Sequence, residues 1–177
     1  MLRRVCIVVL SRANYGRSKS IIDAVHNDLE LDLQLIVGAS ALDELHGNVS
    51  KVIEEDGYPI TAKVDILLSS STPASMATTT GLGIIKLSSI FEVLKPDFVV
   101  TIADRYETMA TAIAASFLNI CLVHVQGGEI TGSVDESVRH AITKLSHLHF
   151  PSTKEAAENI IRLGEPRNQV FHVGCPA

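Results

Sequence analysis

Carboxylates near two predicted strand ends are the groups in this sequence best suited to proton transfer. Asp104 follows the apolar run Phe98–Ile102, while Glu129 and Asp135 lie in the segment after a second apolar run, Cys121–Val125. Several carboxylates held near the ends of neighbouring strands can supply the acid and the base of a reaction. We therefore take Asp104, Glu129 and Asp135 as candidate catalytic residues.

The same carboxylates also fit ordinary structural roles. Asp104 with Glu107 three residues later has the pattern of a capping box, and either Ser133 or Asp135 is placed to cap a helix start. Asp135 could equally pair with Arg139, because residues four apart share one face of a helix. A structural role and a catalytic role do not exclude each other, so both stay open at this point.

Two further segments have the composition of ligand-binding loops. Ser11–Arg17 contains two arginines just before a predicted helix, which suits a phosphate or diphosphate, although a solvated basic turn has the same composition. It lacks the GxGxxG spacing of a dinucleotide-binding turn. Gly127 and Gly128, after Gln126, would let the backbone approach a ligand closely, although a glycine-rich loop before a capped helix explains the pattern too.

The histidines and cysteines do not form a metal-binding pattern. His124 lies inside an apolar run and is expected in the core or beside the site, and the other histidines lack ligand spacing. The cysteines are widely spaced, which fits neither a disulfide framework nor a metal site: Cys6, Cys121 and Cys175. We expect reduced thiols, no metal and a cytoplasmic protein.

Strand-length apolar runs alternate with helical periodicity along the chain. The runs are nearly continuous in Val, Ile, Leu and Phe, which is typical of strands buried on both faces of a parallel sheet. They are Val5–Leu10, Leu33–Val37, Ala62–Leu68, Phe98–Ile102, Cys121–Val125, Leu148–Phe150 and Val170–Val173. Helices are expected over Arg17–Asp28, Thr78–Leu94, Tyr106–Leu118, Asp135–Ser146 and Thr153–Leu163, with a broken helix over Ala41–Asp56.

This alternation predicts one α/β domain over residues 1–177, a Rossmann-like, doubly wound parallel sheet. Ser69–Thr80 is interpreted as a loop that leads into a helix. In open parallel sheets, ligands bind beyond the carboxyl ends of the strands. The candidate carboxylates and arginines all follow predicted strands, so we expect them at that edge.

Composition argues against several other classes of protein. The net charge is -5, which does not indicate a nucleic-acid-binding surface. No apolar run reaches the roughly 18 residues that suggest a membrane span. The basic and apolar N-terminus ends at Ser11-Arg12 without a small-residue cleavage site, so it is predicted to be a strand and not a signal peptide. We expect neither a nucleic-acid nor a membrane partner.

Four segments resemble motifs of bacterial sugar-nucleotide 2-epimerases. Ile102–Glu107 is similar to their GDRxE-type motif, and Ser11–Gly16 resembles their SRAxYG-like loop. The longest match starts at His124 as HVQGGE and continues from Asp135 as DESVRHAITK, and it resembles a block of the hydrolysing members. Val173–Pro176 is similar to the end of their first domain. The whole chain thus resembles the N-terminal half of a hydrolysing UDP-N-acetylglucosamine 2-epimerase.

The resemblance implies one half of a GT-B-like architecture, in which two Rossmann-like domains enclose the active site. It implies conversion of UDP-N-acetylglucosamine and water to UDP and N-acetylmannosamine, a step that feeds sialic-acid-type synthesis. Proton abstraction at C2 and loss of UDP would give a glycal, and water would then add with inverted configuration at C2. The resemblance implies no cofactor, neither nicotinamide nor metal.

By motif position, the resemblance assigns acid/base roles to Asp104 and Asp135, and it makes Glu129 a further acid/base candidate. A leaving diphosphate needs cationic donors, and proton abstraction needs placed carboxylates. Three family positions that face the sugar diphosphate are occupied by arginine. With two further polar residues of the matching segments, the expected substrate-binding set is Arg12, Arg17, Arg105, Gln126 and Arg139.

The chain departs from the family pattern at three positions. Gln126 stands where some relatives carry a catalytic glutamate, and a glutamine cannot usefully accept a proton. Either Glu129 takes that role or the chemistry differs in detail. Asn14 stands where an acidic residue is common, and Ala103 replaces the usual glycine before Asp104.

The family's second domain, which holds most of the nucleotide contacts and completes the cleft, is not in this sequence. We therefore expect the chain alone to be folded but inactive, and a homodimer through the first domain is a further expectation. Two alternatives stay open. One is a domain of a non-hydrolysing 2-epimerase or a GT-B glycosyltransferase, and the other is a non-catalytic ligand-binding or interaction domain.

Overall fold

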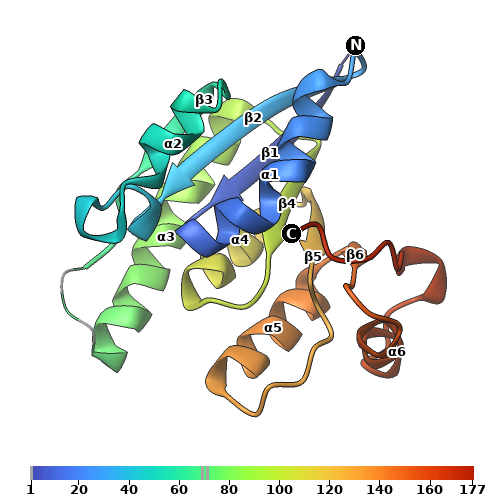
Figure 1. Ribbon diagram of the computed structural model, residues 1–177. Helices are drawn as coiled ribbons and strands as arrows, with labels where there is room; N and C mark the ends of the chain where they lie inside the picture. The colour runs from blue at the N-terminus through green and yellow to red at the C-terminus, as the bar shows by residue number, and fades with distance from the viewer. Residues whose placement is uncertain (1, 69, 71) are drawn as a thin grey trace.

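Six parallel strands form one sheet in the order β3-β2-β1-β4-β5-β6 (Figure 1). The structure, a computed structural model, describes residues 2–68, 70 and 72–177. The strands are β1 (Arg3–Val9), β2 (Leu31–Gly38), β3 (Ile60–Val64), β4 (Phe98–Ile102), β5 (Cys121–Val125) and β6 (Leu148–Phe150). The predicted Rossmann-like, doubly wound sheet is therefore confirmed, and its order reverses between β1 and β4.

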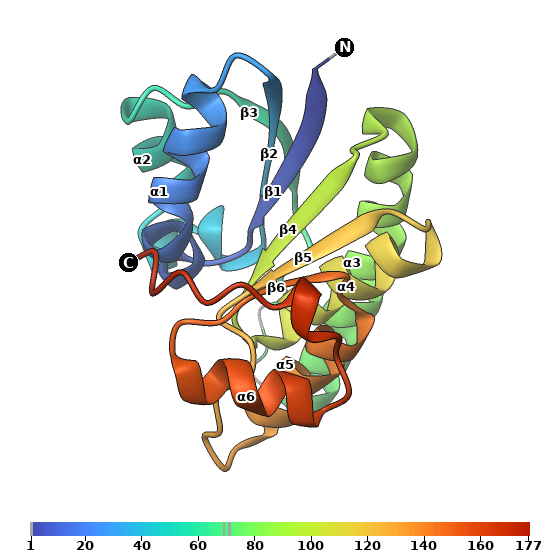
Figure 2. The ribbon, with the colours of Figure 1, turned by 90° about the vertical axis from the view of Figure 1, so that its right-hand side faces the viewer.

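Helices cover both faces of this sheet, as the turned view in Figure 2 shows. On one side lie α1 (Arg12–Asn27) and α2 (Val49–Glu55). On the other lie α3 (Pro73–Leu94), α4 (Tyr106–Phe117) and α5 (Val134–Leu145). Beyond β6 follows α6 (Lys154–Arg162), and short 3-10 turns cover Ala39–Ala41, Glu44–His46 and Arg167–Gln169.

The alternation of side chains along β1 explains why the molecule has two cores. Val5, Ile7 and Val9 point to the core shared with α1 and α2, whereas Cys6 and Val8 point to the core shared with α3, α4 and α5. Successive residues of a strand face opposite sides of a sheet. A central strand that is covered on both sides must therefore be apolar at every position, which accounts for the continuous apolar runs.

The predicted strand bounds hold best in the half of the sheet formed by β4, β5 and β6. The bounds of β4, β5 and β6 are those predicted, while β1, β2 and β3 are shifted at their ends. The strand predicted over Val170–Val173 is wrong, because the chain there forms only an isolated bridge between His149 and Val170. Such an edge segment has a neighbour on one side only, so an apolar run alone does not secure a strand.

Helices α1 and α3 each begin five residues earlier than predicted, and in both cases a hydroxyl caps the start. The Ser11 side chain accepts a hydrogen bond from the N–H of Asn14, so α1 begins at Arg12 and not at Arg17. Thr72 accepts from the N–H of Ser75 in the same way, and Pro73 opens α3. Serine and threonine caps followed by proline are typical helix starts. The predicted loop before α3 is thus shorter, and two of its residues, Ser69 and Ser71, lie outside the described residues.

Within the described part of the chain, α3 is one helix with the length and apolar composition of a membrane span. Leu87 and Phe91 of this helix are buried against the sheet, which a core helix of the same composition would also show. Ile85 and Val93 on its other side are exposed. Length and composition alone therefore do not assign α3 to a membrane.

Candidate active site

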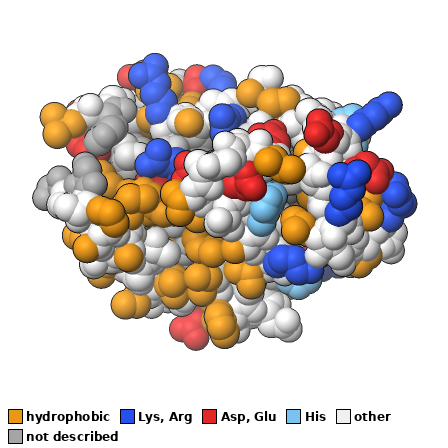
Figure 3. Space-filling view, turned by 90° about the horizontal axis from the view of Figure 1, so that it is seen from below, with side chains coloured by type: hydrophobic (Ala, Val, Ile, Leu, Met, Phe, Trp, Pro, Cys, Tyr) orange, Lys and Arg blue, Asp and Glu red, His pale blue; other side chains and the backbone are white. Residues whose placement is uncertain are grey.

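The candidate residues lie where the strand order reverses, at the carboxyl edge of the sheet. The strands run downward in Figure 2, so this edge is the face that Figure 3 shows. On that face, acidic and basic side chains gather beside an apolar area (Figure 3). Loops after β1, β4, β5 and β6 meet there, which is the usual ligand position in an open parallel sheet.

An ion pair between Asp104 and Arg139 is the centre of the site. Arg139, whose side chain is only 5% exposed, donates from Nη2 to Oδ2 of Asp104, whose side chain is 17% exposed. Its Nη1 donates to the backbone carbonyl of Glu129 at 2.6 Å. In the described part of the chain, Oδ1 of Asp104 has no hydrogen-bond donor. One carboxylate oxygen is thus fixed by the arginine while the other is free to take a proton or a ligand.

This pairing decides between the structural roles that the sequence left open. Asp104 does not cap α4: the capping position is Arg105, and no side-chain cap bond is formed there. The capping-box interpretation is wrong because Glu107 turns to Arg105 and accepts two hydrogen bonds from its guanidinium, at 2.9 and 3.1 Å. Arg139 pairs with Asp104 and not with Asp135, the partner that helical spacing suggested.

The other two candidate carboxylates, Glu129 and Asp135, precede Arg139 by ten and four residues and differ in their surroundings. Asp135 is half-buried in the first turn of α5, one turn before Arg139 on the same helix face. The Glu129 side chain lines a pocket of about 270 Å³ between its own loop and the start of α6, with Thr153 and Asn159. Only the backbone of Glu129 contacts Arg139.

Glu136 closes the loop that leads into α5. Its Oε2 accepts hydrogen bonds from the N–H groups of Thr131 and Gly132, both at 2.6 Å. These two donors lower the pKa of the Glu136 carboxyl group. Ser133 occupies the capping position, but its side chain forms no cap bond, and Glu136 instead binds the loop just before the helix.

The glycine pair after β5 is required by contacts within the protein. A Cβ atom on Gly127 would lie 2.8 Å from Nδ1 of His124, and one on Gly128 would lie 2.2 Å from the carbonyl oxygen of Ala156. Gly128 also has φ +81°, a conformation that L side chains rarely adopt. The sequence suggested close approach to a ligand, whereas the structure shows close approach to a histidine and to α6.

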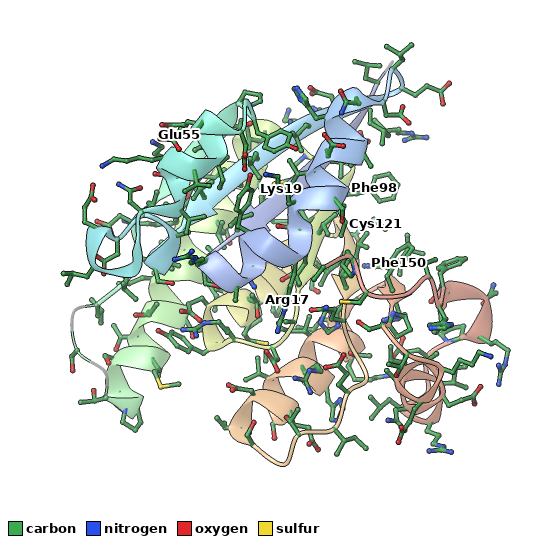
Figure 4. All side chains as sticks on the ribbon, in the orientation of Figure 1. Arg17, Lys19, Glu55, Phe98, Cys121 and Phe150 are labelled. Atoms are coloured by element: carbon green, nitrogen blue, oxygen red, sulfur yellow. The ribbon has the colours of Figure 1, made fainter. Side chains whose placement is uncertain are left out.

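The expected arginines are distributed over three places. Arg12 and Arg17 are exposed on α1, and Nη1 of Arg12 lies beside Gly47. Figure 4 shows Arg17 below Phe98, toward the lower, carboxyl edge of the sheet. Arg105 is half-exposed and already paired with the buried Glu107. Of the five expected substrate-binding residues, only Arg139 directly contacts a candidate catalytic side chain in the described chain.

Two of the departures from the family pattern have clear structural consequences. Buried Asn14 accepts a hydrogen bond from the N–H of Leu10 and donates to the carbonyl of Ile102 at 3.4 Å, so it links the ends of β1 and β4. A carboxylate could not donate the second bond. Gln126 is buried at φ +61° and donates to Sγ of Cys175 at 3.1 Å, so its amide faces the C-terminal tail.

The sequence pattern did not mark the buried histidines as functional residues. His124 and His149 are paired in register on neighbouring strands, and neither is exposed. Burial lowers the pKa of His124 to about 4. Burial also lowers the pKa of His149, opposed by Glu165, whose Oε2 lies 3.4 Å from Nε2. Their position in apolar runs was the only sequence signal, and it predicts a core histidine equally well.

No group of three or more His, Cys, Asp or Glu side chains within residues 2–68, 70 and 72–177 is arranged to hold a metal ion. The three cysteines are free thiols, and burial raises the pKa of Cys6 strongly.

Comparison with known proteins assigns the family. Residues 23–177 match the family model described as UDP-N-acetylglucosamine 2-epimerase. A UDP-N,N'-diacetylbacillosamine 2-epimerase (hydrolyzing) from Legionella pneumophila is 39% identical over 99% of the chain and 47% of its own length. A GDP/UDP-N,N'-diacetylbacillosamine 2-epimerase (hydrolyzing) from Campylobacter jejuni is 38% identical over 99% of the chain and 46% of its own length.

A solved structure extends the likeness to three dimensions. The UDP-GlcNAc 2-epimerase of Methanocaldococcus jannaschii, in complex with UDP-GlcNAc and UDP, matches 97% of this chain and 46% of its own, with a TM-score of 0.85 and 26% identity. The chain spans about half the length of the curated relatives it matches. From the family match, the sequence identity and the shared fold, the chain belongs to the UDP-N-acetylglucosamine 2-epimerase family.

Proposed function

We propose that this chain supplies the acid/base half of a hydrolysing sugar-nucleotide 2-epimerase. The observation that carries the proposal is the Asp104–Arg139 pair at the reversal of strand order, which orients a carboxylate with one open oxygen. Asp135 lies one turn from Arg139 and supplies a second carboxylate on the same helix face. Two relatives that are 39% and 38% identical are named hydrolyzing 2-epimerases, which favours hydrolysis over simple epimerisation.

The proposed reaction has two stages: elimination of UDP, which breaks the C2–H and C1–O bonds, and addition of water across the resulting C1–C2 double bond. A carboxylate takes the proton from C2, the C–H electrons form the C1–C2 double bond, and the C1–O bond breaks as UDP leaves. Water then adds its oxygen at C1, and a proton returns to C2 on the opposite face. Asp104 and Asp135 are the proposed proton carriers, and Glu129 is a third candidate. Cationic groups stabilise the leaving diphosphate, the role proposed for Arg12, Arg17 and Arg105.

The proposed substrate is a UDP-linked 2-acetamido sugar, because the C2 proton and the diphosphate leaving group are what the reaction requires. UDP-N-acetylglucosamine, with N-acetylmannosamine as product, is the substrate that the motif resemblance implies. UDP-N,N'-diacetylbacillosamine is a second candidate, since the names of the two relatives above carry it. A place in sialic-acid-type synthesis belongs to this same proposal.

We further propose that activity needs a second half, because the relatives are about twice as long as this chain. The isolated chain is expected to be folded and inactive in a cytoplasmic setting. A homodimer is proposed through the exposed side of α3, where Ile85 and Val93 are 66% and 80% exposed. Sedimentation of the chain with Ile85→Glu tests this, since a dimer through α3 should dissociate and one through another surface should not.

The decisive experiment joins this chain to the remaining half of the Legionella pneumophila relative. The chimera is incubated with UDP-N-acetylglucosamine and, separately, with UDP-N,N'-diacetylbacillosamine, and free UDP and free sugar are quantified. Equal amounts of UDP and a C2-inverted free sugar support the proposal, and the preferred substrate identifies the sugar. Arg167→Gln, in the exposed 3-10 turn after α6, is the control for Asp104→Asn and Asp135→Asn.

Other outcomes contradict the proposal in distinct ways. Appearance of a UDP-linked epimer without free UDP would assign the non-hydrolysing reaction. Binding of UDP without turnover of either sugar would favour a non-catalytic domain, provided that Asp104→Asn leaves the binding unchanged. Robust release of UDP by the isolated chain would contradict the need for a second half.

A further inference from the structure

His124 connects the two backbone segments that carry the central ion pair. Its Nε2 lies 2.9 Å from the carbonyl oxygen of Ala103, the residue before Asp104. Its Nδ1 lies 3.1 Å from Oγ1 of Thr143, which follows Arg139 by one turn of α5. We infer that His124 is a positioning residue: its neutral imidazole holds Asp104 in the orientation that proton transfer requires, an inference that rests on the proposed function.

The two hydrogen bonds allow only one tautomer of the ring. A carbonyl oxygen can only accept, so the proton lies on Nε2 and is donated to Ala103. Nδ1 is then a bare acceptor and receives the hydroxyl proton of Thr143. A protonated ring would carry a second N–H toward the hydroxyl and a charge into a fully buried place. Burial lowers the pKa of His124 to about 4, so the neutral form persists at ordinary assay pH.

The bond to Ala103 explains how a strained backbone is held before Asp104. Ala103 has φ +64°, a left-handed conformation that costs a non-glycine residue about 1–2 kcal/mol. Its N–H donates to the carbonyl of Val125 at 3.0 Å, and its carbonyl accepts from His124. Both polar groups of this residue are therefore fixed to adjacent residues of β5. The direction in which the chain enters Asp104 follows from these two bonds.

The bond to Thr143 fixes the other partner of the ion pair. Arg139 and Thr143 are four residues apart, so they lie on one face of α5, and both are buried. Gly127 closes the space around this bond, since a Cβ atom there would lie 2.9 Å from Oγ1 of Thr143. The helix can neither rotate nor slide without breaking the contact with His124. One imidazole thus sets the separation of Asp104 and Arg139.

Three variants test this role in the 177-residue chain. His124→Gln keeps one donor and one acceptor, whereas His124→Leu removes both, and Thr143→Val removes only the hydroxyl. The readouts are the imidazole tautomer, from long-range proton–nitrogen NMR, and the Nε–H signal of Arg139. We expect a proton on Nε2, a displaced or broadened Arg139 signal in His124→Leu and Thr143→Val, and near recovery in His124→Gln. His172→Gln, in the exposed tail, is the control.

The same variants in the active chimera separate positioning from structure alone. We expect His124→Leu to lower kcat about a hundredfold with KM changed less than about threefold, and His124→Gln to recover most of the loss. A proton on Nδ1, or an unchanged Arg139 signal in both Thr143→Val and a folded His124→Leu, overturns the inference. Equal kcat for Leu, Gln and wild type overturns it as well. If the wild-type chimera is inactive, the proposed function fails, while the NMR measurements still decide the positioning.

Discussion

The two sides of the carboxyl edge differ in burial and in hydrogen bonding. The β4–α5 side comprises Ala103, Asp104, His124, Arg139 and Thr143. Asp104 is partly buried, the other four are buried, and hydrogen bonds join them. On the β1–α1 side, Arg12 and Arg17 stand exposed on α1. The first side is organised before any ligand arrives, as proton transfer needs. The second can adapt to an anion, as the proposed binding of a flexible diphosphate requires.

The largest difference between the two sides should appear when an arginine is removed from each. Arg139→Met leaves the half-enclosed carboxylate of Asp104 and the Glu129 carbonyl without their donor. We expect a loss of about 3–5 kcal/mol in the free energy of unfolding. Arg17→Met on the exposed side should change it by less than about 0.5 kcal/mol. Urea denaturation followed by circular dichroism measures both, and equal losses would remove the contrast between the sides.

A similar contrast lies within the loop after β5. Gly128→Ala forces a Cβ atom against the Ala156 carbonyl at φ +81°, so both overpacking and strain oppose folding. We expect a loss of about 2–5 kcal/mol. Gly132→Ala is the matched control, since it has φ +70° but nothing within 4 Å, and it should cost only about 1 kcal/mol. If Gly128→Ala were as stable as Gly132→Ala, α6 would have to move away from the added Cβ atom at little cost.

The pH dependence of the free energy of unfolding should reveal the burial of His124 on the β4–α5 side. Because burial lowers the pKa of His124 from 6.5 to about 4, the unfolded chain binds a proton more readily than the folded one. Stability therefore falls as pH drops from about 6.5 to about 4, and this group contributes about 3 kcal/mol of the loss. His149, whose pKa is also lowered, acts in the same direction.

His124→Gln isolates that contribution, because glutamine does not titrate. As pH falls below about 6.5, the unfolding free energy of wild type should fall relative to that of His124→Gln. Chemical denaturation at several pH values gives this difference directly. A difference that stays constant with pH would mean that His124 titrates alike in the folded and unfolded chain.

The smallest effect is expected at the strained residue before Asp104. Ala103→Gly relieves the left-handed strain at φ +64° but increases the freedom of the unfolded chain, so the two terms nearly cancel. We expect the free energy of unfolding to change by less than about 1 kcal/mol. Ala103→Val, which adds a branched side chain at the same φ, should be clearly destabilising. The same denaturation measurement compares the two variants. If Ala103→Gly stabilised the chain by more than about 2 kcal/mol, the strain at Ala103 would outweigh the added freedom of the unfolded chain.

Much of the architecture follows from local sequence patterns. Strands β4, β5 and β6 have the predicted bounds, and in β4 and β5, which lie inside the sheet, residues covered on both faces must be apolar without interruption. The start of α1 was misplaced at Arg17 although its cap, Ser11, is visible in the sequence. The final apolar run did not become a strand, since only a single bridge to His149 forms there.

The site was predicted as a set of residues but not as a set of partners. Asp104 and Arg139 do come together, whereas Glu129 contacts Arg139 only through its backbone carbonyl. Spacing favoured Asp135 as the partner of Arg139 and a capping box for Asp104, and both expectations were wrong. Catalytic and substrate-binding roles for the whole set stay proposals, with the measurements above to test them.

The sequence by itself determined the parallel sheet, the helices that cover it and the edge at which the polar residues gather. These properties depend on periodicity and on the rule that ligands bind at the carboxyl ends of strands. Only the tertiary structure decided which charges pair, which tautomer His124 adopts and why Ala103 is strained. Those outcomes depend on distances between β4, β5 and α5, elements that are far apart in the sequence, and no local pattern encodes such distances.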